Sequence, residues 1–181
     1  MGNLLSTKHT RLDITSDYTD EDLNETLPKL SDVNDLYIHI SGKESNRKVD
    51  IIKKLHTHLA GERNLNLSMD LGWLKSSKGL VKCLEYMPTS TKSAEMRILL
   101  LYIPHRVPPF LYEDFCEVAE ALVNCTCKDV SFTWTFEGYK YQDIEAISSG
   151  LSSRWPELKV TRYSGTVTNF LQMRLRDITT L

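Results

Sequence analysis

The sequence lacks a long hydrophobic run. A membrane-spanning helix needs about 18 or more consecutive apolar residues, and no stretch of this 181-residue chain approaches that length. The apolar pair Leu4 and Leu5 near the start is far too short for a secretory signal. We therefore expect reduced thiols in a cytosolic setting for the four cysteines, Cys83, Cys116, Cys125 and Cys127.

The sequence also lacks the short motifs that accompany common catalytic sites. It contains no Gly-x-Gly-x-x-Gly, no phosphate-binding loop that ends in Gly-Lys-Ser/Thr, and no Gly-x-Ser-x-Gly. His56 and His58 are two residues apart on a predicted helix, so they point to different faces and cannot bind the same metal ion. We predict no catalytic residue, no cofactor and no metal, although a small cytosolic enzyme stays open as an alternative.

Cysteines close in sequence raise the alternative of a zinc site. Cys116, Cys125 and Cys127 together with a histidine would supply four ligands. Their spacing matches no structural zinc pattern, and buried free thiols are far commoner. We therefore interpret these cysteines as buried thiols.

Charge is distributed unevenly along the chain, although the total is only −2. Residues 1–35 hold three basic and eight acidic side chains, whereas residues 43–82 hold nine basic and four acidic ones. Residues 1–34 are also polar and poor in aromatics, which is typical of a flexible segment. We predict a flexible acidic tail over residues 1–34, with a short helix near 20–27, and a globular domain over residues 35–181.

The globular part alternates between strand-like and helix-like hydrophobic patterns. Residues 129–138, DVSFTWTFEG, place every second apolar side chain on one face, which predicts a strand. Residues 111–123 repeat apolar side chains at helical spacing instead. The same reasoning predicts further strands at 36–41, 65–71 and 96–104, further helices at 47–61, 75–87 and 140–151, and a closing hairpin at 157–177. The fold class predicted is α+β, one compact domain with a mainly antiparallel sheet packed by several short helices.

The N-terminus matches the Met-Gly-x-x-x-Ser pattern of N-myristoylation through Gly2 and Ser6, with Lys8 as a favourable basic residue. An unmodified start is the alternative. A single myristoyl chain binds membranes only marginally, so a second signal is needed. The basic stretch or self-association would supply it, since linked weak contacts act together. The candidate contact residues are lysines, Lys48, Lys53, Lys54, Lys75, Lys78 and Lys82, for which an ordinary solvated surface is the alternative.

Several segments, taken in order, resemble the matrix proteins of rhabdoviruses, especially those of the vesiculovirus type. The segments are DLYIHISGKESNRKVDIIKKLHTHLAG, LKSSKGLVKCLEYMPTST, YIPHRVPPFLYEDF, KDVSFTWTFEG and YQDIEAISSGLSSRW. Their order and spacing over residues 35–181 carry the resemblance. Two features depart from that family: the tail is acidic and has no Pro-rich budding motif, and the loop MPTSTKSAEM is short.

The resemblance implies a non-enzymatic viral matrix protein that self-associates at the inner face of a membrane, condenses the nucleocapsid and supports virion assembly and budding. Its partners would be further copies of itself, an anionic membrane, the viral nucleocapsid or nucleoprotein and host proteins, with no sequence-specific nucleic acid. The six lysines would contact the membrane or the nucleocapsid. The expected location is the virion and the host cytoplasm beneath host membranes, with the nucleus as a further site. An accessory relative that acts as a host-interaction module is the main alternative.

Overall fold

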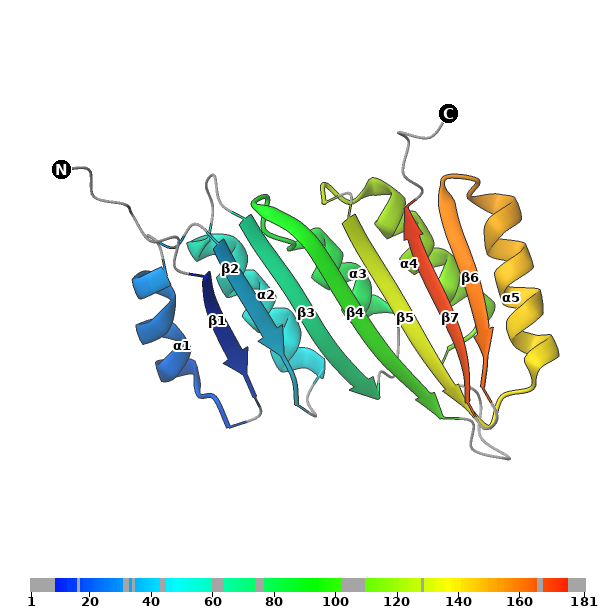
Figure 1. Ribbon diagram of the computed structural model, residues 1–181, viewed down its shortest axis with the longest axis horizontal. Coiled ribbons are helices and arrows are strands. Elements are labelled where there is room, and N and C mark those ends of the chain that lie inside the picture. The colour runs from blue at the N-terminus through cyan, green and yellow to red at the C-terminus, as the bar shows by residue number, and fades with distance from the viewer. Residues whose placement is uncertain are drawn as a thin grey trace.

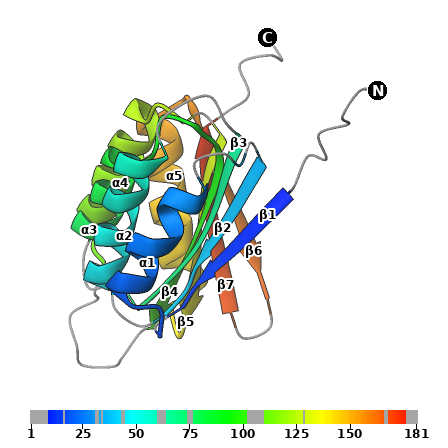
Figure 2. The same cartoon turned by 90° about the vertical axis from the view of Figure 1, so that its left-hand side faces the viewer.

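In the part of the chain that the structure describes, a seven-stranded sheet carries five α-helices on one of its faces (Figures 1 and 2). This computed structural model describes residues 9–15, 17–30, 33, 35–42, 45–59, 64–73, 77–101, 110–127, 129–165 and 168–175. The elements in chain order are β1 (His9–Ile14), α1 (Asp20–Thr26), η1 (Leu27–Leu30), β2 (Asp35–Ile40), α2 (Ser45–His58), β3 (Asn64–Trp73), α3 (Lys78–Glu85), β4 (Thr91–Leu101), α4 (Tyr112–Asn124), β5 (Asp129–Glu137), α5 (Tyr141–Arg154), β6 (Leu158–Ser164) and β7 (Thr168–Leu175).

The strand order is β1-β2-β3-β4-β5-β7-β6. The pairings from β1 to β5 are parallel, and only β7 runs against its two neighbours, β5 and β6. Each parallel strand is followed by a helical segment that returns the chain to the start of the next strand. Because every return lies on the same side, the other side of the sheet stays uncovered (Figure 2). We call that side the uncovered face.

The α+β class is confirmed, but the prediction of a mainly antiparallel sheet is wrong. Alternating apolar and polar residues are commonest in antiparallel sheets, because those often leave one face in water. Here a parallel sheet alternates for the same reason, since helices cover only one of its faces. In β5, Val130 and Phe132 point to the core, while Ser131 between them lies on the uncovered face.

The predicted tail is wrong over the residues that the structure describes. β1 pairs in parallel with β2, and Ile14, Leu23 and Leu27 are fully buried against the domain. The short helix expected near 20–27 is confirmed as α1, which begins with a capping box between Thr19 and Asp22. The sequence pattern did not predict that β1, α1 and η1 pack on the domain, because their few apolar residues are spread over three short elements. Residues 1–8, including Gly2, Ser6 and Lys8, lie outside the described part of the chain.

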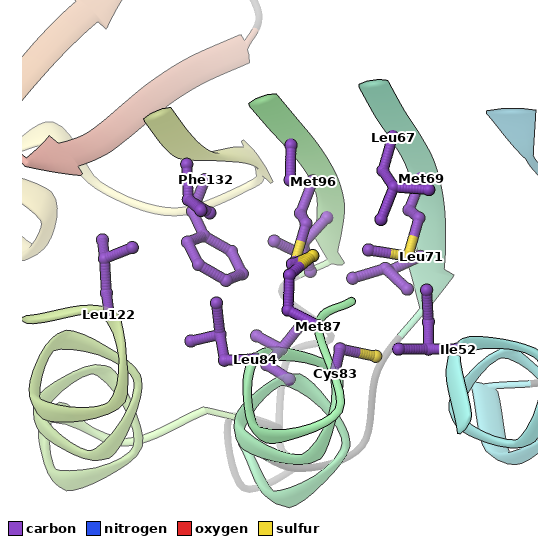
Figure 3. Close-up of a cluster of buried hydrophobic side chains, with 14 of the residues drawn as sticks. Ile52, Leu67, Met69, Leu71, Cys83, Leu84, Met87, Met96, Leu122 and Phe132 are labelled. Atoms are coloured by element: carbon purple, nitrogen blue, oxygen red, sulfur yellow. The ribbon is translucent and has the colours of Figure 1, made fainter. Parts of the chain in front are cut away.

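The hydrophobic core fills the space between the sheet and the helices (Figure 3). Figure 3 shows side chains of three helices and the segment after α3 facing those of three strands: Ile52, Cys83, Leu84, Met87 and Leu122 opposite Leu67, Met69, Leu71, Met96 and Phe132. Farther along β5, the Phe115 ring of α4 meets Trp134 edge-on at 5.5 Å between ring centres. All four cysteines are buried and lie outside any disulfide, which confirms their interpretation as buried thiols.

Candidate functional site on the uncovered sheet face

The uncovered face is polar, and it is preformed by the sheet. Parallel sheets usually have both faces covered, so an uncovered one is unusual. On β5 this face carries a row of hydroxyl side chains, Ser131, Thr133 and Thr135, opposite the buried aromatic residues of the same strand. The two ends of the face differ in chemistry.

Acidic and basic side chains on β3 and β4 neutralise one another. Arg97 Nε lies 3.4 Å from Asp70 Oδ1 and 3.5 Å from Glu95 Oε1. His39 Nε2 lies 3.7 Å from the other oxygen of Asp70. Exposed ion pairs contribute little to stability, but they satisfy each charge within the protein. This part of the face therefore presents few uncompensated charges to a ligand.

A second paired group lies at the β1 edge. Arg11 Nε donates hydrogen bonds to both carboxylate oxygens of Asp13, at 3.0 and 2.9 Å, and its guanidinium lies 5.2 Å from the centre of the Tyr37 ring. These hydrogen bonds hold the pKa of the Asp13 carboxyl below its usual value. Arg11 is thus committed to neighbours in its own chain.

Ser68, His39 and Asp70 are the residue types that serine hydrolases use, but their geometry here differs from that of a catalytic triad. Ser68 Oγ lies 3.3 Å from His39 Nδ1 and accepts a hydrogen bond of the same length from Arg97 Nη2. A nucleophilic serine must present its oxygen to the substrate beside an oxyanion site. Ser68 is only 2% exposed, beneath its polar neighbours. The cluster therefore serves as a structural network, and we assign it no catalytic step.

The other end of the face, on β5, β7 and β6, is organised in three rows by strand register. Residues directly opposite one another in an antiparallel pair share a face and lie within about 5.5 Å. Along the strands, the rows are Tyr163, Phe170 and Thr135; Thr161, Gln172 and Thr133; and Lys159, Arg174 and Ser131. We call them the aromatic row, the amide–hydroxyl row and the basic row. Tyr163 is 55% exposed, and Phe170 is partly exposed.

The basic row is the only place on the described part of this face where two cations oppose each other without an acid. Lys159 and Arg174 are paired in register and both exposed, and neither forms an ion pair within 4 Å in the described part of the chain. Like charges directly opposite each other destabilise a sheet. By contrast, Arg162 points to the helix side and pairs with Glu145 of α5 at 2.8 Å. The basic row is therefore a preformed site for an anion.

The six lysines singled out in the sequence do not form one surface. Lys48 is 2% exposed and donates a hydrogen bond to the Asp70 carbonyl, so its predicted role as a surface contact is wrong. Lys53 lies over the Tyr86 ring, and Lys54 pairs with Asp20. Lys78 and Lys82 are exposed on α3, and Lys75 lies outside the described residues. For the lysines on the surface, a membrane or nucleocapsid contact stays a prediction.

Sequence reasoning missed the residues of the basic and aromatic rows. Their signal is present as alternation in the closing hairpin, where Lys159 and Tyr163 alternate with Leu158, and Phe170 and Arg174 flank buried positions. Alternation alone does not say which residues oppose one another across the hairpin. That information comes only from the observed register.

Three solved structures resemble this chain weakly. No family model and no curated protein matches the sequence. SMU.1697c of Streptococcus mutans, assigned as a methyltransferase and solved in complex with SAH, aligns over 93% of this chain and 90% of its own, with 11% identity and a TM-score of 0.38. LepI in complex with SAM aligns over 77% and 42% of the two chains, with 10% identity and a TM-score of 0.27. A pericyclic reaction enzyme aligns over 85% and 47%, with 12% identity and a TM-score of 0.29.

These findings contradict the hypothesis of a non-enzymatic viral matrix protein and that of its accessory relative. The matched structures are an assigned methyltransferase, LepI with SAM and a pericyclic reaction enzyme, and none of the three is a matrix protein. The parallel sheet also differs from the mainly antiparallel one that we expected. We therefore withdraw that function, together with the prediction that the chain has no enzymatic activity. Acylation of Gly2, self-association and a location beneath host membranes stay predictions.

The matches do not assign S-adenosylmethionine to this chain. TM-scores of 0.27 to 0.38 are too low to carry an activity across. In doubly wound sheets, nucleotide-like ligands bind in a crevice where the strand order reverses and helices change face. From β1 to β5 the order never reverses, and the helices keep to one face (Figure 2). In the described residues, no helix is long and apolar enough to span a membrane, and no cluster of three or more metal-binding side chains occurs.

Proposed function

We propose that the β5–β7–β6 end of the uncovered face binds single-stranded nucleic acid without sequence specificity. The observation that carries the proposal is the basic row, in which Lys159 and Arg174 oppose each other with no acid between them. Two neighbouring phosphates of one nucleotide chain placed there would replace the repulsion between the two cations with a charge-assisted contact at each. The aromatic row, beyond the amide–hydroxyl row, supplies what a phosphate site alone does not, a surface on which bases can stack.

The spacing of the rows suits a nucleotide chain. The aromatic and basic rows are four residues apart along β6 and β7, which at about 3.3 Å per residue is roughly 13 Å. A single-stranded nucleic acid that crosses the rows can stack a base on Tyr163 or Phe170 while a phosphate further along its backbone reaches Arg174. The amide–hydroxyl row lies between them, and its Gln172 side chain can donate to and accept from a base edge or a ribose hydroxyl.

The remaining charges favour a short, single-stranded ligand. Glu95 of β4 lies opposite Ser131, one strand beyond the basic row, so a polyanion that extended from the row past β5 would meet a carboxylate. A duplex also hides its bases from flat stacking on a sheet. The protein as a whole carries a net charge of −2, so binding depends on this local patch.

The test is fluorescence anisotropy of a labelled 12-residue oligouridylate with the full-length protein at low salt. We expect saturable binding, with a slope of log K against log salt of about −1.4, because two phosphates are neutralised at about −0.7 each. Arg174→Ala should flatten that slope to about −0.7. Tyr163→Ala should weaken binding by about 1–3 kcal/mol and leave the slope unchanged.

Matched control variants remove cations that already contact other side chains of the protein. Lys53→Ala removes a cation from the helix side, and Arg11→Ala removes one from the paired β1 edge of the same face. Neither should change the affinity by more than about twofold, since exposed charges far from a ligand are largely screened. The proposal is wrong if no binding is detected at millimolar protein, or if the controls weaken binding as much as Arg174→Ala does.

A further inference from the structure

A groove of about 650 Å³ runs between α3 and α4 on the helix side of the molecule. Its floor is apolar and includes Val81, Leu84 and Ala121. One end is held by Ser77, which precedes α3 and whose hydroxyl lies 2.6 Å from Glu117 Oε2 of α4. The groove is therefore built by two helices that are tied together, and it lies on the opposite side of the sheet from the uncovered face.

Opposite charges predominate on the two walls of the groove, although Glu85 at the end of α3 also lines it. Lys78 and Lys82 project from α3, four residues apart, and Glu117 and Glu120 project from α4, three residues apart. All four side chains are exposed, and no ion pair within 4 Å joins the two walls in the described part of the chain. The groove thus keeps apart charges that would otherwise pair with each other.

We propose that this groove docks an amphipathic helix of a partner protein, with acidic residues on the flank that faces Lys78 and Lys82 and basic residues on the flank that faces Glu117 and Glu120. Charges spaced three or four residues apart lie in a row along a helix, so each wall offers a row that a second helix can match. An apolar stripe on that helix would cover the floor, as in other helix-in-groove complexes. Two helices packed about 8–10 Å apart leave a furrow above them that suits a third.

A small amphiphile, such as a fatty acid, is the competing occupant. Its carboxylate would pair with the lysines of α3, and its hydrocarbon chain would cover the apolar floor of the groove. It would leave Glu117 and Glu120 facing apolar carbon or water, however, so it uses only half of the charge pattern. The charge pattern therefore favours a helix, and the proposal does not depend on nucleic-acid binding at the other face.

The experiment uses three labelled 14-residue peptides, each two repeats of a heptad with leucines at two positions. The mixed peptide repeats Lys-Leu-Ala-Gln-Leu-Glu-Ala; an acidic version replaces its lysines with glutamate, and a basic version replaces its glutamates with lysine. Binding to the full-length protein is measured by anisotropy. We expect the mixed peptide to bind roughly fivefold more tightly than either of the others, the effect of about two exposed ion pairs.

Variants of the walls should then change which peptide binds best. Lys78→Gln with Lys82→Gln leaves only the acidic wall, so the basic peptide should become the tightest. Glu117→Gln with Glu120→Gln should favour the acidic peptide instead. Ala121→Gln fills the groove and should abolish binding, whereas Ala146→Gln on the exposed side of α5 should not. Circular dichroism of each variant confirms that it is folded.

The proposal is overturned if none of the peptides binds at 1 mM, or if the preference among them ignores the wall variants. It is also overturned if dodecanoate saturates the groove and loses affinity with Ala121→Gln while the mixed peptide does not compete with it. That last result would identify a small amphiphile as the occupant.

Discussion

Lys48 provides a sharp test of the energetics of this fold, because the sheet and α2 bury its ammonium group. The residue is 2% exposed, and the Asp70 carbonyl is its one hydrogen-bond acceptor among the described residues. Burial lowers the pKa of Lys48, and the negative charge of Asp70 opposes that shift only in part. We expect Lys48→Met to stabilise the protein, because methionine keeps a similar length of chain in the core without the charge.

The expected gain follows from two opposing effects. Replacement of a buried ion by an apolar residue of similar volume is neutral or stabilising by about 1–4 kcal/mol. Against this, loss of the hydrogen bond leaves the Asp70 carbonyl without that donor, at about 1–2 kcal/mol. The net expectation at pH 7 is a gain of about 1 kcal/mol, which for a protein of this size raises Tm by roughly 2–4 °C.

The pH dependence of unfolding gives the decisive comparison. The native pKa of Lys48 lies below 10.5, so as pH rises from that value towards 10.5 the native state loses the proton while the unfolded state still holds it. The wild type therefore gains stability over this window, and Lys48→Met does not. Urea unfolding followed by circular dichroism should show a difference between the two proteins that is largest at pH 7 and shrinks by pH 10.5. A variant that is less stable at pH 7, or a difference that does not change with pH, would refute this reasoning.

Three further predictions test other parts of the structure. Leu27→Ala should lower the free energy of unfolding by about 2–5 kcal/mol, because Leu27 is fully buried in a segment that the sequence suggested was a tail; Leu111→Ala, at a half-exposed position, should change it by less than about 1 kcal/mol. Arg11→Ala should raise the pKa of Asp13 towards 3.8 in an NMR titration, and an unchanged value would mean that the two side chains do not pair in solution. Cys83, whose pKa burial raises to about 12, should resist a thiol reagent at pH 8 in the native protein and react on unfolding; rapid native labelling of Cys83, read by peptide mass spectrometry, would contradict its burial.

The uncovered face and the α3–α4 groove place two contact surfaces on opposite sides of one domain. The basic and aromatic rows lie on the sheet side, and the charged walls of the groove lie on the helix side. A nucleic acid and a partner helix could therefore bind at the same time without competing. Mixing the labelled oligouridylate with the unlabelled mixed peptide would show directly whether the two sites are independent.

The positions of the secondary-structure elements could be read from the sequence, because they depend on local periodicity. The helix predicted at 111–123 is α4, and the strand predicted at 129–138 is β5, each within one residue at either end. Such patterns arise within a single element, from the repeat of 3.6 residues in a helix and two in a strand. The prediction at 1–34 failed where the elements were too short to show a period, and there burial of Leu23 and Leu27 against the rest of the fold decided the structure.

Only the tertiary structure decided how the elements pair and what they leave exposed. Alternation in β5 is the same whether its neighbours run parallel or antiparallel, so the direction of pairing had to come from the path of the connecting helices. Lys48 looked like one more surface lysine, but the packing of α2 on β3 buried it. Lys159 and Arg174 are 15 residues apart in the chain, and only the register of the closing hairpin sets the two cations side by side. The sequence by itself determined the elements, and long-range pairing, which no local pattern encodes, determined the site.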